Sequence, residues 1–134
     1  MKRLRMSLLL FGSLAVVSMP ALAAPPADGC ATVSVSTSPA TVTAGYGVGF
    51  YGSINNCSSR RERYTVVVSA MSDCGQTTPI ASFRMTFKPG ENRMYGVSHT
   101  TTSNTCTGPC NVTVEVHDGG GVVARTATTF SVVN

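Results

Sequence analysis

The sequence has no tryptophan and only two histidines, His99 and His117, and Asp, Glu, Lys and Arg together make up 12% of its 134 residues. Nucleophilic catalysis needs a base beside the nucleophile, and acid–base catalysis needs a close pair of titratable groups. The carboxylates are scattered one to a predicted turn or strand, and the two histidines are isolated from each other. We therefore predict a non-catalytic protein that uses no cofactor and no metal.

A hydrophobic run long enough to cross a membrane is also missing. The most apolar stretch follows the basic residues Lys2, Arg3 and Arg5 and falls short of the roughly 18 residues that a span needs. It ends in the small-x-small triplet Ala21-Leu22-Ala23. This is the pattern of a secretory signal peptide. We predict a signal peptide over residues 1–23, a mature domain over residues 24–134, no transmembrane segment, and a secreted or periplasmic location.

Positive charge is concentrated in the predicted signal peptide. The whole chain carries a net charge of +4, but without its three N-terminal cations seven basic residues face six acidic ones, a net charge of +1. Nucleic acids and anionic membranes are attracted by a strongly positive surface. We therefore expect no nucleic-acid partner, and the remaining length is enough for one domain.

What the chain does contain is short stretches rich in Val, Thr, Tyr and Phe, separated by Gly, Pro, Asn or Ser. Seven of them at this spacing predict an all-β fold, an antiparallel, seven-stranded immunoglobulin-like Greek-key β-sandwich stapled by disulfides. The predicted strands are Thr32–Thr37, Tyr46–Asn55, Glu62–Met71, Ile80–Phe87, Asn92–Thr100, Asn111–His117 and Val122–Val132.

Alternation along these strands predicts which side chains are buried, because successive residues of a strand point to opposite faces of its sheet. We expect an inward-facing set that contains no tryptophan. It comprises Val33, Val35, Val48, Phe50, Ile54, Tyr64, Val66, Val68, Ala70, Phe83, Met85, Phe87, Val112, Val114, Val116, Phe130 and Val132.

The segment Gly47-Val48-Gly49-Phe50-Tyr51-Gly52 matches the glycine fingerprint of dinucleotide-binding proteins. That fingerprint binds phosphate because its glycines turn from a strand into a helix N-terminus. Here the glycines lie inside an alternating strand with no helix after it. They instead indicate close approach of a neighbouring strand or sheet.

The five cysteines are expected to form disulfides in an oxidising compartment. Counting strand directions places Cys30 and Cys57 at one end of the sandwich, and Cys74, Cys106 and Cys110 at the other. A bridge between the two ends is excluded, because a disulfide allows only about 4.4 to 6.8 Å between Cα atoms. We predict a bridge between Cys30 and Cys57. At the other end we predict a bridge from Cys74 to Cys110, with Cys106 as the alternative partner or the spare thiol.

The densest charge of the predicted mature domain is Arg60-Arg61-Glu62-Arg63, in the loop at the Cys30 and Cys57 end. Arg60, Arg61 and Arg63 form a candidate binding surface for an anionic glycan, a lipid head group or an acidic protein. A solvated loop is the simpler interpretation, because exposed charged loops are common.

Four segments follow a common pattern of turns and strands: Ser38-Pro39-Ala40-Thr41-Val42-Thr43-Ala44-Gly45, Asn55-Asn56, Lys88-Pro89-Gly90-Glu91, and Gly108 leading into 111–116 with Asp118-Gly119 after it. With these segments the chain resembles the small bacterial immunoglobulin-like modules of the cell-adhesion-related (CARDB) type and their fibronectin-like relatives. The resemblance implies a non-catalytic module of a secreted or surface protein that supports adhesion or spacing. The sequence departs from these modules at Pro109-Cys110, where they usually have an aromatic residue, and a disulfide is expected to replace the corner that the aromatic stabilises.

From these observations we expect an exported binding or adhesion module that presents loops or sheet edges to a protein or glycan partner. The alternative is a small disulfide-stapled inhibitor of a hydrolase.

Overall fold

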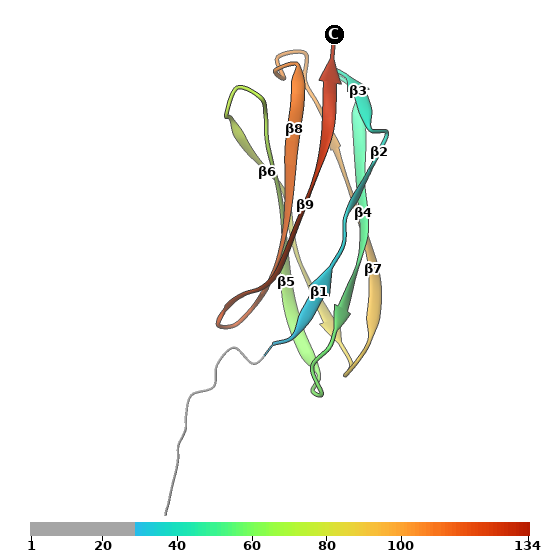
Figure 1. Ribbon diagram of the computed structural model, residues 1–134, viewed down its shortest axis with the longest axis vertical. Coiled ribbons are helices and arrows are strands. Elements are labelled where there is room, and N and C mark those ends of the chain that lie inside the picture. The colour runs from blue at the N-terminus through green and yellow to red at the C-terminus, as the bar shows by residue number, and fades with distance from the viewer. Residues whose placement is uncertain (1–28) are drawn as a thin grey trace, which may run out of the picture.

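The computed structural model describes residues 29–134, and the predicted signal peptide lies outside them. Figure 1 shows an elongated sandwich of two β-sheets. Its strands are β1 (Ala31–Val33), β2 (Ser36–Ser38), β3 (Thr41–Thr43), β4 (Gly47–Asn56), β5 (Glu62–Met71), β6 (Thr77–Phe87), β7 (Asn92–Thr100), β8 (Gly108–Asp118) and β9 (Gly121–Val133). Nowhere in residues 29–134 does the chain form a helix long and apolar enough to cross a membrane.

The smaller sheet has four strands, all paired antiparallel. Strands β1 and β2 lie end to end along one side of β4, and β7 lies along the other side. The larger sheet has the order β3-β9-β8-β5-β6. The chain therefore passes from one sheet to the other between β2 and β3, β3 and β4, β4 and β5, β6 and β7, and β7 and β8.

The described residues form nine strands where the sequence predicted seven. The predicted first strand, Thr32–Thr37, is interrupted at Ser34 and Val35 and becomes β1 and β2. The third strand, β3, lies between the first two predicted strands, in a segment for which the sequence predicted no strand. It pairs parallel with β9, Val42 opposite Val132, so the expectation of a purely antiparallel fold is also wrong.

The other six predicted strands are present: β5 and β7 have the predicted bounds, and β4, β6, β8 and β9 have shifted ends. Strand β6 begins at Thr77, three residues earlier than predicted, and includes Pro79. Proline is tolerated there because β6 is an edge strand, where a missing N–H breaks no ladder. Strand β8 begins at Gly108 and not at Asn111, which brings Cys110 into the sheet.

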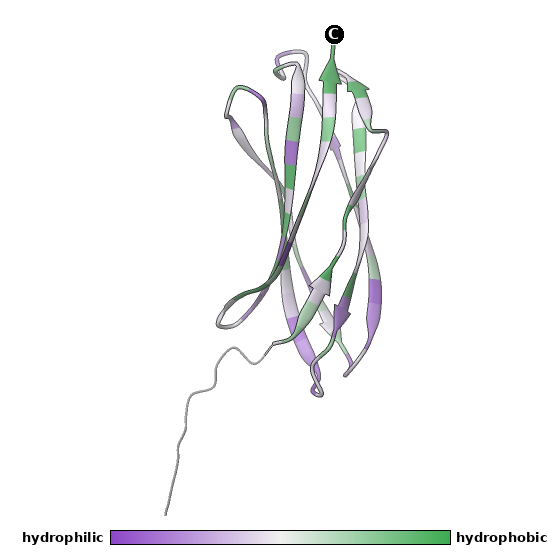
Figure 2. Cartoon of the chain, in the orientation of Figure 1, coloured by the Kyte–Doolittle hydropathy of each residue, from purple (hydrophilic) through white to green (hydrophobic). Residues whose placement is uncertain are grey.

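The core lies between the two sheets. Figure 2 shows hydrophobic and hydrophilic residues alternating along the long strands, as on β8. The rings of Phe50 and Phe130 join the two layers, with centroids 5.6 Å apart. Most of the predicted inward set is buried. Val33 and Phe83 are only half-buried because they lie on edge strands, and Val35 is half-buried in the break between β1 and β2. Tyr95 and Cys110 belong to the core as well, which the sequence did not predict.

Candidate functional site

The loops of the sandwich gather at two ends, and each end carries one disulfide. At one end Cys30 is bridged to Cys57, the pairing that strand direction favoured, with a Cα–Cα distance of 5.0 Å. The backbone N–H of Cys57 also donates to the Cys30 carbonyl at 2.9 Å. The segment before β1 and the loop after β4 are therefore fixed to each other.

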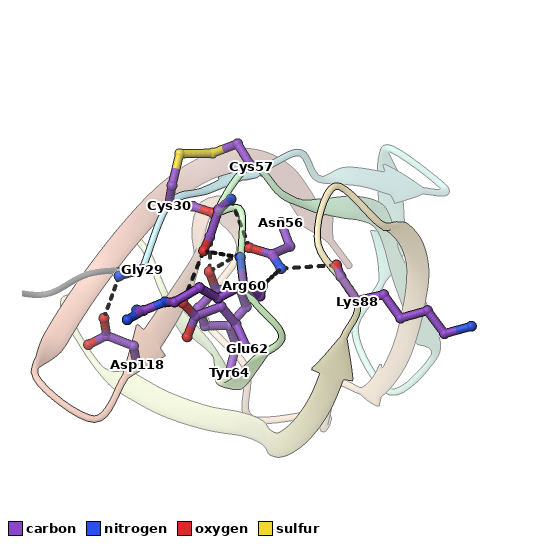
Figure 3. Close-up of a disulfide and its surroundings, with 10 residues drawn as sticks. Gly29, Cys30, Asn56, Cys57, Arg60, Glu62, Tyr64, Lys88 and Asp118 are labelled. Atoms are coloured by element: carbon purple, nitrogen blue, oxygen red, sulfur yellow. Dashed lines mark hydrogen bonds and ion pairs between the residues drawn. A yellow bond between two sulfur atoms is a disulfide. The ribbon is translucent and has the colours of Figure 1, made fainter.

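Beside this bridge, the fully buried side chain of Asn56 connects three segments (Figure 3). Its amide nitrogen donates to the Arg60 carbonyl at 2.9 Å and to the Lys88 carbonyl at 3.0 Å. Its amide oxygen accepts from the Ser58 N–H at 3.0 Å. The Tyr64 hydroxyl lies 3.1 Å from that oxygen and can donate to it. The amide thereby uses both of its donors and its acceptor within the protein, which holds the β4–β5 and β6–β7 loops together.

The three arginines of the predicted binding surface are held in this loop and at the start of β5, but they differ in their surroundings. Arg60 forms an ion pair with Glu62 at 3.0 Å. Arg61 and Arg63 are exposed, and no ion pair joins either of them to another residue within 29–134. The exposed side chain of Lys88 extends from the neighbouring β6–β7 loop (Figure 3).

The nearby carboxylates of Glu91 and Asp118 already accept hydrogen bonds from backbone N–H groups. Glu91 accepts a hydrogen bond from the Lys88 backbone N–H at 2.8 Å, and Asp118 accepts from the Gly29 N–H at 3.1 Å. Burial, followed by the charge of Glu62, raises the pKa of the Tyr64 hydroxyl, which therefore stays a neutral donor. The Cys30–Cys57 end thus presents the cations of Arg61, Arg63 and Lys88 to solvent from two connected loops and the start of β5.

At the opposite end, Cys74 is bridged to Cys106, with a Cα–Cα distance of 6.2 Å. This is the alternative pairing, and the preferred pairing of Cys74 with Cys110 is wrong. Cys110 is a free, buried thiol. It lies opposite Phe130 in the β8–β9 register and points into the core, whereas Cys106 lies in the loop near Cys74. The corner expected to be held by a disulfide at Cys110 is therefore packed by an unpaired cysteine.

Next to this second bridge is a cavity of about 250 Å³. Its wall combines apolar side chains with hydroxyl and amide groups and contains no carboxylate, lysine or arginine. The lining residues are Ala70, Ser72, Gln76, Thr78, His99, Thr101, Thr102, Asn104, Thr105, Cys106, Cys110 and Phe130. Its volume is slightly below the range of about 300 to 1,000 Å³ that is usual for small-molecule sites.

The free thiol in the cavity wall is poorly suited to nucleophilic chemistry. Burial, followed by the negative charge of Asp73, raises the pKa of Cys110, so the thiol form dominates at neutral pH. The thiolate is the reactive species. Because Cys74 pairs with Cys106, Cys110 remains a buried thiol that packs in the core.

The two histidines are far from forming a catalytic arrangement. His99 lines the cavity, while His117 lies on the outer face of the larger sheet, where its Nε2 is 3.0 Å from Glu115 Oε1. Glu115 also accepts hydrogen bonds from Arg125, at 2.6 and 3.0 Å. Within residues 29–134, no three side chains of His, Cys, Asp or Glu gather closely enough to hold a metal ion.

Sequence reasoning found the arginines but missed the residues that support them. Asn56 and Lys88 were named only within the segments that resemble CARDB modules, and nothing in their local sequence shows that they meet. The cavity was missed as well, because its lining comes from both sheets. Cys110 could have been recognised, since it alternates in phase with Val112, Val114 and Val116.

No family model matches the chain, and no curated protein matches it in sequence. Solved structures match its fold. A β-glucosidase from Listeria innocua in complex with glucose aligns with 79% of this chain and 16% of its own length, at a TM-score of 0.65 and 13% identity. An alkylpurine DNA glycosylase from Pseudomonas fluorescens bound to DNA containing an abasic site analog aligns over 81% and 31%, at a TM-score of 0.61 and 12% identity.

A third structure is similar over most of its own length. The CARDB domain of a Pyrococcus furiosus protein, in complex with di-metal ions, aligns with 79% of this chain and 88% of that domain, at a TM-score of 0.55 and 16% identity. Identities this low show a shared fold alone. The chain corresponds to less than a third of the glucosidase and of the glycosylase, and to nearly the whole of the CARDB domain.

Proposed function

We propose that this chain is an exported, non-catalytic immunoglobulin-like module with Greek-key connections, similar to CARDB and fibronectin-like modules, that binds an acidic partner through its Cys30–Cys57 end. The similarity to nearly all of the CARDB domain supports the fold assignment. The two disulfides support passage through an oxidising compartment. A binding role without catalysis agrees with the scattered histidines and carboxylates.

The observation that carries the proposal is a difference between the charged groups at one rigid end. Its carboxylates already interact with other groups of the protein, whereas two of its arginines are exposed. Glu62, Glu91 and Asp118 are engaged by Arg60 or by backbone N–H groups. Arg61 and Arg63 remain exposed. Because Asn56 and the disulfide already fix the loop, little conformational entropy is lost when a partner binds there. The partner chemistry that fits is clustered carboxylate or sulfate groups.

The experiment compares the double variant Arg61→Ser/Arg63→Ser with Arg84→Ser/Arg125→Ser, which removes the same charge from exposed positions on β6 and β9. The probes are immobilised heparin, polygalacturonate and poly-glutamate, and the readout is the salt concentration at which each protein elutes. We expect the first variant to elute at much lower salt than the wild type and the second to elute near it. Equal behaviour of the two variants, or no retention of the wild type on any probe, would refute the proposal.

The inhibitor alternative makes a different prediction for the same loop. An inhibitor would form a tight, stoichiometric complex with one soluble hydrolase and abolish its activity, whereas an adhesion module would bind surfaces or polymers and leave hydrolases active. Capture from the native secretome, followed by activity assays on the captured enzyme, distinguishes the two functions.

A further inference from the structure

The outward-facing residues of β1, β2, β4 and β7 include no acidic or basic side chain. They lie on the side of the four-stranded sheet that points away from the core (Figure 1). The outward residues are Thr32, Ser36, Ser38, Gly47, Gly49, Tyr51, Ser53, Asn55, Asn92, Met94, Gly96, Ser98 and Thr100. The outer face of the larger sheet differs, because it carries ionised groups such as Glu115 and Arg125.

In the middle of this uncharged face, the ring of Tyr51 lies flat against the sheet. A Cβ atom placed on Gly96, its partner on β7, would lie 3.0 Å from the Tyr51 Cδ1 atom. A Cβ atom on Gly49 would lie 2.7 Å from Cε2 and Cζ of the same ring. Both edges of the ring therefore rest on glycine backbone. One face of the ring is covered by the sheet and the other points to solvent, and 49% of the residue is exposed.

Hydroxyl groups lie beside the exposed ring, and two amide side chains lie further along the same face. Ser98 lies opposite Gly49 in the β4–β7 register, and Asn92 lies opposite Asn55 further along the same two strands. On the other side of β4, the Ser36 hydroxyl donates to the Tyr51 carbonyl at 3.3 Å. Met94, opposite Ser53, is 79% exposed and extends the apolar surface next to the ring.

We propose that this face is a binding platform for a neutral glycan, with Tyr51 as the stacking residue. The flat C–H face of a pyranose packs against an aromatic ring, and hydroxyl and amide groups at its edges exchange hydrogen bonds with the sugar hydroxyls. A ring already held against two glycines loses little rotamer freedom on binding.

The absence of charge selects this class of ligand. An anionic polysaccharide, a nucleic acid or a charged protein surface would be desolvated against the thirteen outward positions without meeting a counter-charge. A neutral polyhydroxylated chain has no such cost. The platform is on a different surface from Arg61 and Arg63, so this inference goes beyond the proposed function and does not depend on it.

Affinity electrophoresis in native gels tests the platform, with separate gels containing a mixed-linkage β-glucan, xyloglucan, galactomannan, arabinoxylan and amylose. We expect at least one of these polymers to retard the wild-type protein, and Tyr51→Ala to weaken that retardation at least about tenfold. Tyr51→Phe, which keeps the ring, should bind as the wild type does. Gly96→Val, which pushes the ring off the sheet, should bind weakly, and circular dichroism checks that each variant is folded.

Two results would overturn the inference. The first is that none of the five polymers retards the wild type. The second is that Tyr51→Ala is retarded as strongly as the wild type. If that variant differs from the wild type only by ceasing to self-associate in size-exclusion chromatography, the face is a contact between copies of the chain and the inference is also wrong. The double variant Arg61→Ser/Arg63→Ser should be retarded by the glycan as strongly as the wild type. The glycan platform and the acidic-partner site can therefore fail or succeed independently.

Discussion

The hydroxyl of Tyr95 on β7 donates a 2.7 Å hydrogen bond to the backbone carbonyl of Ser34, which lies on the far side of β4 between β1 and β2. The side chain passes beneath Gly52, its direct partner in the β4–β7 register. Burial raises the pKa of Tyr95 to about 12, so the hydroxyl remains a donor at all ordinary pH values. The bond ties the two outer parts of the smaller sheet together beneath its central strand.

This relationship predicts that Gly52→Ala is severely destabilising. The new methyl group would collide with the Ser34 carbonyl carbon, 2.7 Å away, and with the Tyr95 hydroxyl, 2.9 Å away. Since the first of these atoms is backbone, the edge strand itself would have to move, and we expect a loss of about 3 kcal/mol or more in the free energy of unfolding. Urea denaturation measures it. Gly119→Ala is the control, because a Cβ atom there has nothing within 4 Å.

At the Cys30–Cys57 end, Asn56→Ala should lower the free energy of unfolding by about 2 kcal/mol or more. The substitution leaves the Arg60 and Lys88 carbonyls without their amide donor in a partly buried site. Asn55→Ala, on the outward face beside it, should change stability by less than about 0.5 kcal/mol. Chemical denaturation of both variants provides the comparison, and equal losses would show that the amide does not brace the loops.

The cysteine pairing predicts a single protected thiol. A thiol-specific reagent should not modify the native protein, because Cys110 is 2% exposed, and should modify one residue in guanidinium without reductant. Fragment-ion mass spectrometry must locate the label, since no Lys or Arg separates Cys106 from Cys110. A label on Cys106 would contradict the pairing. The variant Cys110→Ala should carry no label at all.

The pair formed by Glu115 and Arg125 predicts a small dependence of stability on pH. Hydrogen bonds from Arg125, and then from His117, lower the pKa of Glu115 in the folded state. The folded protein therefore binds the proton less readily than the unfolded chain does. The contribution of Glu115 to the free energy of unfolding is present above the ordinary glutamate pKa of about 4.3 and is lost as the pH falls through the lowered pKa.

For exposed groups this contribution is about 0.5 kcal/mol. Denaturation of the wild type and of Glu115→Gln is repeated from neutral to acidic pH. The two free energies of unfolding should differ at neutral pH and become equal in acid. A difference that grew as the pH fell would contradict the lowered pKa.

Alternation made much of this fold predictable. The buried positions of β5 and β8 follow from a period of two, which is a property of each strand by itself. The end at which each cysteine lies follows from strand direction, and it was unaffected by the two extra short strands near the N-terminus. The start of β8 was placed three residues late, and this error alone hid the inward phase of Cys110.

The sequence by itself determined the class of the fold, the inward phase of the long strands and the ends of the sandwich that carry cysteine, because local periodicity and chain direction encode all three. Only the tertiary structure decided that β3 joins the opposite sheet, that Cys106 and not Cys110 reaches Cys74, and that Tyr51 rests on Gly49 and Gly96. These are contacts between segments that are distant in the sequence. They depend on packing across sheets and strands, and no local pattern of residues contains that information.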